Sequence, residues 1–134
     1  MEIGLSKVNY LAVLAGAVFN MILGTIWYGP LFGKLWIKQI DKKSEDIESN
    51  PLMYIFSFVA AYLSGIVLYL VVIAFGSATF GAGLLAGVVT WVGFVVTTTL
   101  TYSLFEGPKL SVWMLFVLYQ LVIFGVVGGV FAVW

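Results

Sequence analysis

The stretch VNYLAVLAGAVFNMILGTIWY, residues 8–28, contains no charged side chain. As an α-helix rising about 1.5 Å per residue it measures roughly 31 Å, and the hydrocarbon layer of a bilayer is about 30 Å thick. A helix also satisfies its own backbone hydrogen bonds, as a chain surrounded by lipid must. We therefore expect this stretch to cross a membrane.

Three further apolar runs without a charged residue follow it, at about residues 52–75, 83–104 and 110–134. Asn50-Pro51 supplies an N-cap and a first-turn proline for the second run. Gly107-Pro108 marks a tight turn between the last two runs, which should lie antiparallel and side by side. The sequence predicts one transmembrane domain over residues 1–134, an all-α integral membrane four-helix bundle.

The composition supports a lipid environment. Hydrophobic residues make up 63% of the chain and charged residues 9%, whereas soluble domains are nearer half and a quarter. The formal net charge is zero and arginine is absent, so the chain lacks the basic surface that nucleic-acid binding requires. Cysteine and histidine are absent too. Their absence excludes disulfides, thiol nucleophiles, imidazole bases, and thiolate or imidazole metal sites.

The connection between the first two runs, about residues 31–50, is the longest. Trp27 and Tyr28 precede it and are typical of the aromatic belt at a membrane surface. Apolar residues then recur at helical spacing, with lysines on the other side, which predicts a short interfacial amphipathic helix. Its apolar side consists of Leu31, Phe32, Leu35, Trp36 and Ile40, and its polar side includes Lys34 and Lys38. Residues 41–49 read as a charged, water-exposed linker.

Lysines also predict orientation. The long connection contains Lys34, Lys38, Lys42 and Lys43, and the turn on the same side contains Lys109. The opposite side has only Lys7. By the positive-inside rule the long connection is cytoplasmic and both termini are outside. The predicted interface residues are Trp27, Tyr28, Lys34, Trp36, Glu106 and Lys109, with Glu106 a candidate ion-pair partner of Lys34 or Lys109.

Polar residues near the middle of each run are the candidate site, because each is costly in hydrocarbon unless it finds a partner. This midplane polar cluster consists of Asn20, Tyr62, Ser64, Thr90, Trp91, Tyr119 and Gln120. One interpretation is a polar pocket or pathway. The other, which we favour, is that these groups bond to one another and fix the packing of the helices.

A hydroxyl face formed by Thr97 and Thr101 allows two similar interpretations. It could line a path for small ions or solutes. Alternatively, the hydroxyls bond back to carbonyls one turn earlier in the same helix. Neighbouring Thr98 and Thr99 point elsewhere, so the hydroxyls do not form one continuous stripe.

Small residues recur every four positions and indicate closely packed helices, within one subunit or between copies. The sets are Ala12, Gly16, Asn20 and Gly24; Ser57, Ala61 and Gly65; Gly83 and Gly87; and Gly125 and Gly129. We expect a homo-oligomer. No paired carboxylates, activated nucleophile or metal-ligand spacing occurs, so we expect no catalytic residue, metal or cofactor.

Three segments carry a resemblance. They are Val8–Val13 leading to Ile26–Pro30 and Phe32–Trp36, then Gly93–Gly107, and finally Tyr119-Gln120. Together they resemble a prokaryotic family of small four-span membrane proteins, catalogued as domain of unknown function 1761. The resemblance implies an α-helical fold in the prokaryotic inner membrane and supplies no activity, substrate or catalytic residue. Members often have Tyr-His where this chain has Tyr119-Gln120, so any histidine chemistry would be missing here.

The resulting hypothesis is a non-enzymatic multi-pass membrane protein, an oligomeric bundle that binds membrane lipids or a partner membrane protein. The alternative is a passive channel or transporter for a small solute. Its path would run past Asn20, Thr97, Thr101 and Gln120. Proton-coupled export is disfavoured, because no run contains the carboxylate that it needs.

Overall fold

The computed structural model describes residues 3–40 and 50–134, and over these ranges the chain is helical and contains no strand. Four helices are long and apolar enough to cross a membrane: Tyr10–Leu31, Pro51–Ala74, Phe80–Phe105 and Leu110–Val133. The prediction of an all-α four-span fold is confirmed. The linker expected at residues 41–49, with Lys42 and Lys43, lies outside the described ranges.

Two of the four spans are interrupted by a wider, π-helical turn. The elements in chain order are η1 (Leu5–Lys7), α1 (Tyr10–Ile26), η2 (Trp27–Leu31), α2 (Gly33–Gln39), α3 (Pro51–Ala74), α4 (Phe80–Thr90), η4 (Trp91–Val96), α5 (Thr97–Phe105) and α6 (Leu110–Val133). The first span is α1 with η2, and the third is α4, η4 and α5. The short helix expected after the first span is α2.

Gly29-Pro30 forms a kink within the first span. Gly29 leaves the helical region, with φ −107° and ψ −107°. The helical path still continues to Leu31, because the amide of Phe32 bonds to the oxygen of Trp27 at 2.9 Å across the wider turn. The kink redirects the chain into α2.

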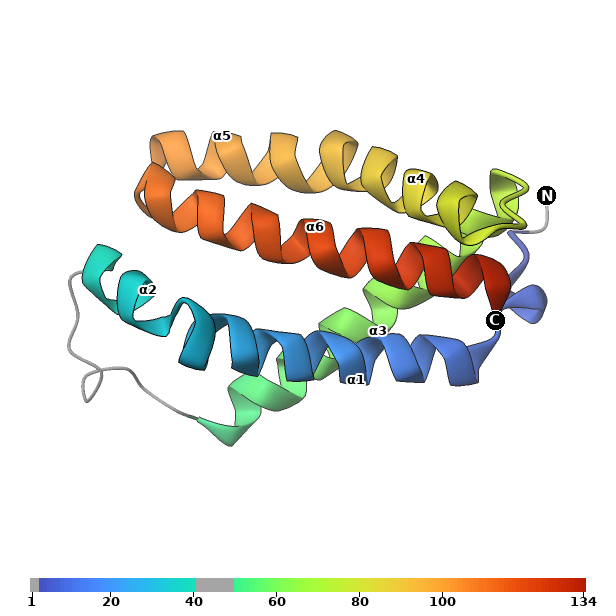
Figure 1. The fold of residues 1–134 in the computed structure, drawn as a ribbon, viewed down its shortest axis with the longest axis horizontal. Coiled ribbons are helices and arrows are strands. Elements are labelled where there is room, and N and C mark those ends of the chain that lie inside the picture. Colours follow the sequence, from blue (N-terminus) through green and yellow to red (C-terminus); the bar gives the residue numbers. More distant parts are fainter. Residues whose placement is uncertain (1–2, 41–49) are drawn as a thin grey trace.

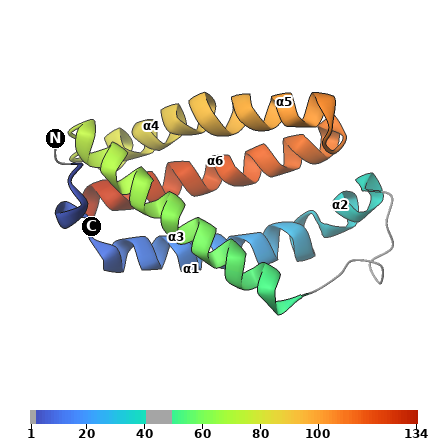
Figure 2. The ribbon, with the colours of Figure 1, turned by 180° about the vertical axis from the view of Figure 1, so that it is seen from behind.

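Helix α6 is the centre of the bundle. It lies between α1 on one side and α4 with α5 on the other, and it runs antiparallel to α4 and α5 (Figure 1). Seen from behind, α3 crosses α1 and α6 diagonally (Figure 2). Half of the most apolar stretch of α6 is buried, against 17% in each of the other spans. The two termini lie at the same end of the bundle (Figure 1).

Side-chain caps and a left-handed glycine set the helix ends. Asn9 accepts from the amides of Leu11 and Ala12 at 3.1 Å and caps α1. Asn50 accepts from the amide of Leu52 at 3.0 Å and caps α3, as the sequence predicted. Gly76, with φ 64°, follows the end of α3, where a side chain would be strained.

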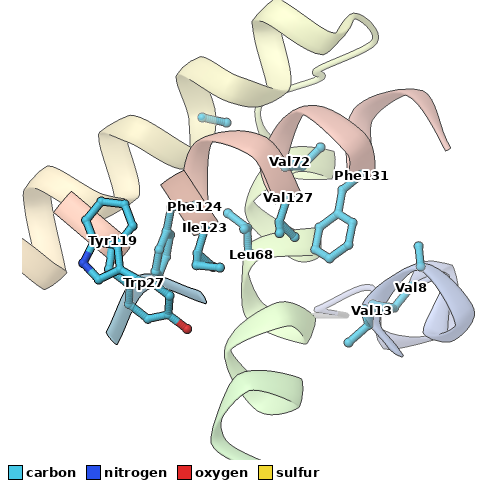
Figure 3. Packing of buried hydrophobic residues seen from close by; sticks show 12 residues of the cluster. Val8, Val13, Trp27, Leu68, Val72, Tyr119, Ile123, Phe124, Val127 and Phe131 are labelled. Carbon is cyan, nitrogen blue, oxygen red and sulfur yellow. The ribbon is translucent and has the colours of Figure 1, made fainter. Parts of the chain in front are cut away.

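The buried apolar residues form one cluster, drawn from α1, α3 and α6 above all (Figure 3). Val13 of α1 is fully buried, and Leu68 of α3 and Phe131 of α6 are each 3% exposed. The small-residue face of α1 packs against α6 in this region. A Cβ on Gly16 would lie 3.0 Å from Val127 and 3.3 Å from Phe131. The core therefore lies where three spans meet.

Helices α4 and α6 approach each other most closely through glycines. A Cβ on Gly87 would lie 2.0 Å from the oxygen of Phe124, and one on Gly83 would lie 2.2 Å from the oxygen of Gly128. No side chain fits at either position. The backbones touch directly, as small-residue interfaces in membranes allow.

Candidate functional site

The site is built around a pair of polar residues on α1 and α6. The hydroxyl of Tyr119 donates to the backbone oxygen of Asn20 at 2.7 Å and also contacts the Asn20 side-chain oxygen. Gly24, one turn after Asn20, makes room for it, because a Cβ there would lie 3.0 Å from the hydroxyl. Two of the seven predicted midplane residues are thus directly bonded.

Aromatic rings surround this pair. The ring centroids of Tyr119 and Tyr28 are 5.8 Å apart with the ring planes inclined by 64°, and the centroids of Tyr119 and Trp27 are 6.1 Å apart. Trp36 of α2 packs edge-on against Tyr28 at 5.1 Å. Such contacts add about 0.5–1.5 kcal/mol beyond the burial of area. They attach α2 and the kink in the first span to α6.

Two tryptophans bond to opposite sides of α6. The indole nitrogen of Trp27 donates to the oxygen of Leu115 at 3.1 Å, and that of Trp91 donates to the oxygen of Val117 at 2.8 Å. Each tryptophan is the first residue of a π-helical turn, η2 or η4. Leu115 and Val117 are two positions apart, so their directions on the helix differ by about 200°. Trp27 is 9% exposed, so it packs inside the bundle.

The threonine run that follows η4 bonds to that turn's own backbone. The hydroxyls of Thr97, Thr98 and Thr99 donate to the oxygens of residues 93, 94 and 95. Thr101 likewise donates to the oxygen of Thr97 at 3.1 Å. Hydroxyls of this kind supply donors where a distorted membrane helix loosens its backbone bonds. The hydroxyls of Thr97, Thr98 and Thr99 therefore act as backbone partners of the wide turn, and that of Thr101 bonds within α5.

The remaining midplane residues lie apart from the Asn20–Tyr119 pair. The hydroxyl of Thr90 donates to the oxygen of Ala86 in its own helix at 2.8 Å. Tyr62 is partly buried against the core. Within the described ranges, the side chains of Tyr62, Ser64 and Gln120 make no hydrogen bond. The structure therefore does not join all seven residues into one network.

A small hollow lies beside the pair, where α1, α3 and α6 meet. Its lining consists of Gly16, Asn20, Ala61, Ser64, Gly65, Leu68, Ile123, Phe124 and Val127, and its volume is about 10 Å³. One water molecule needs about 10–15 Å³. The hollow is too small for a solute larger than water.

The predicted interface residues of α2 and of the turn between α5 and α6 lie at the end of the bundle opposite the termini (Figure 1), whereas Trp27 and Tyr28 pack inward against Tyr119. Lys34 and Glu106 are exposed, and Lys109 has a bonding partner. Nearby, the hydroxyl of Ser111 donates to the side-chain oxygen of Gln39 at 2.7 Å, which joins α2 to α6. No ion pair between Glu106 and either lysine is present among the described residues.

Several contacts of the site were not predicted from the sequence. Trp113 donates to the hydroxyl of Thr99 at 2.9 Å, and Ser111 reaches Gln39. The turns η2 and η4, whose tryptophans bond to α6, share a sequence pattern: Trp-x-Gly occurs at residues 27–29 and again at 91–93. Both occurrences begin a π-helical turn.

The four spans and the buried polar contacts define the class of this chain, a multi-pass α-helical membrane protein. It belongs to the family described as Protein of unknown function (DUF1761), whose model matches residues 11–132. No curated protein and no solved structure matches the chain. The resemblance noted in the sequence is thereby confirmed over most of the chain.

Proposed function

We propose that this protein is a non-enzymatic module of the prokaryotic inner membrane that assembles with copies of itself and binds lipid or a partner membrane protein. The observation that supports the proposal is the exposure of the first part of α3. Residues 51–57 are exposed on every side of the helix, although α3 is one of four spans. Tightly packed membrane helices associate by van der Waals contact, so this segment is the surface most available to a neighbour.

Polar groups near this surface favour a helix neighbour over lipid alone. Ser57 of α3 is exposed and makes no hydrogen bond within the described residues. Small hydroxyl residues on a membrane helix are typical of interfaces, where backbones approach closely. An adjoining copy would supply the packing that the first turns of α3 lack within one chain.

Cross-linking tests the assembly. The chain contains no cysteine, so any cross-link must form through the single cysteine that is introduced. Phe56 on α3 and Phe94 on the third span are matched in exposure, at 69% and 70%. We expect F56C to form cross-linked dimers in lipid bilayers and F94C to form few. Equal yields that fall on dilution with lipid would indicate random collision and contradict the proposal.

The passive channel receives less support. The hydroxyls of Thr97 and Thr101 are bonded to the helix backbone, and the hollow at Asn20 has a volume of only about 10 Å³. We expect liposomes containing the protein to pass neither ions nor small polar solutes. Flux that disappears in Asn20→Leu or Gln120→Leu would favour the channel instead.

The proposed orientation, with both termini outside the cell, has its own test. Ile3 near one terminus is 63% exposed, and Lys38 of α2 is exposed at the other end of the bundle. We expect a membrane-impermeant maleimide added to intact spheroplasts to label Ile3→Cys and not Lys38→Cys. The reverse pattern would place α2 outside.

A further inference from the structure

The hollow between α1, α3 and α6 is lined by two residues with polar side chains and seven without. Of its nine lining residues, only Asn20 and Ser64 have side chains with polar atoms. Asn20 lies on α1 and Ser64 on α3, so the hollow has a hydrogen-bonding group on two different spans. Both residues fall near the middle of their helices, far from either membrane surface.

Each of these groups still needs a hydrogen-bond partner. The Asn20 side-chain oxygen is occupied by the Tyr119 hydroxyl, which leaves the amide nitrogen with two donors. Within residues 3–40 and 50–134 no acceptor for that nitrogen, and no partner for the Ser64 hydroxyl, is present. Every described polar atom that is fully buried does have a partner. Asn20 is half-buried and Ser64 is exposed, so neither the Asn20 amide nor the Ser64 hydroxyl is fully enclosed, and both residues line the hollow.

Several threonine hydroxyls in the spans bond to the backbone of their own helix. Thr25 and Thr90 each bond to the carbonyl four residues earlier, at 3.0 and 2.8 Å. Ser64 makes no such bond. Its hydroxyl is thus free to bond across the hollow. Hydrocarbon has no hydrogen-bonding group to offer it, and leaving a polar group unpaired there costs free energy.

We propose that the hollow is a binding site for one structural water molecule, which accepts from the Asn20 amide and bonds to the Ser64 hydroxyl. The volume of about 10 Å³ fits one water and excludes a lipid headgroup or a larger solute. The water links α1 to α3, and through Tyr119 it extends the bonded network to α6. It thereby joins three spans near the middle of their helices.

Nuclear magnetic resonance in nanodiscs tests the site. We expect magnetisation transfer from water to the side-chain amide protons of Asn20, observed as a cross-peak at the water frequency. Ser64→Ala should abolish this cross-peak. Ser57→Ala is the matched control, because Ser57 lies on the same helix, is also unbonded, and does not line the hollow. It should leave the cross-peak intact.

Three results would overturn the proposal. The wild-type protein could show no water cross-peak at Asn20, or Ser64→Ala could leave it unchanged. A cross-peak from acyl-chain protons in place of water would show that lipid occupies the hollow. Tyr119→Phe serves as a second variant: the folded protein should keep a water contact at Asn20, since Ser64 remains, while the Asn20 amide resonances shift.

Discussion

The hydroxyl of Tyr119 donates to the backbone oxygen of Asn20 across a distance of 2.7 Å, and it joins residues that are 99 positions apart in the chain. The bond links the first span to the last. Gly24 is what permits the approach, since any side chain there would meet the tyrosine hydroxyl. A polar bond inside a membrane holds its partners because hydrocarbon offers no replacement.

Removing that hydroxyl should weaken the bundle. Tyr119→Phe keeps the ring contacts with Trp27 and Tyr28 and loses only the bonds to Asn20. Interhelical bonds in membranes contribute about 0.6 kcal/mol on average and up to about 1.7 kcal/mol, so we expect a loss in this range. Unfolding in mixed detergent measures it. Tyr69→Phe is the control, because Tyr69 packs on Phe131 and its hydroxyl has no partner in the described chain.

Close packing of α4 on α6 should not tolerate a methyl group. In Gly87→Ala the new Cβ would lie 2.0 Å from the oxygen of Phe124, so the two helices must separate. Overpacking of this kind costs about 1–3 kcal/mol. Gly93→Ala, where nothing lies within 4 Å of the added Cβ, should be neutral or slightly stabilising. Equal stabilities of the two variants would show that the helices do not touch here.

The π-helical turn η4 should depend on threonine hydroxyls. In the double variant Thr97→Val with Thr98→Val, the oxygens of Gly93 and Phe94 lose their side-chain donors. We expect the carbonyl carbon resonances of these two residues to move upfield. Thr101→Val is the matched control and should move only the carbonyl of Thr97. Unchanged resonances at Gly93 and Phe94 would mean that the hydroxyls do not support the turn.

The start of α1 should be sensitive to its cap. Asn9 accepts from two backbone amides at 3.1 Å, and replacing such a cap by alanine typically costs about 1 kcal/mol. We expect Asn9→Ala to speed hydrogen exchange at the amides of Leu11 and Ala12, and Asn9→Ser to restore most of the protection. Fast exchange in both variants would indicate that the asparagine acts through something other than its cap.

The spans could be predicted from the sequence because a membrane helix is specified by length and uniform apolarity. Leu110–Val133 and Pro51–Ala74 need no partner to be recognised. Which span lies at the centre was not predictable in the same way. The helix α6 is apolar on every side, so no periodic stripe indicates its neighbours, and only the packed structure shows that it is half buried.

The sequence predicted which polar residues belong to the site, but not which of them bond to each other. Asn20 and Tyr119 were both identified because each is costly in lipid, but depth alone does not show which residues face each other. Thr90 bonds to its own helix, and Trp91 reaches the carbonyl of Val117. Backbone carbonyls carry no sequence signal as acceptors, so the tryptophan bonds to Leu115 and Val117 could be recognised only in three dimensions.

The central position of α6 has a consequence for biosynthesis. The ribosome makes this segment after the other three, so the first three spans are complete before α6, which they pack against, has been made. Until α6 is made, Asn20 lacks the hydroxyl of Tyr119 as a donor. The indoles of Trp27 and Trp91 likewise lack their carbonyl acceptors on α6. In a nascent chain interrupted before Leu110, α1 and α3 could still pack on each other, but the polar groups of Asn20, Trp27 and Trp91 would lack their partners on α6.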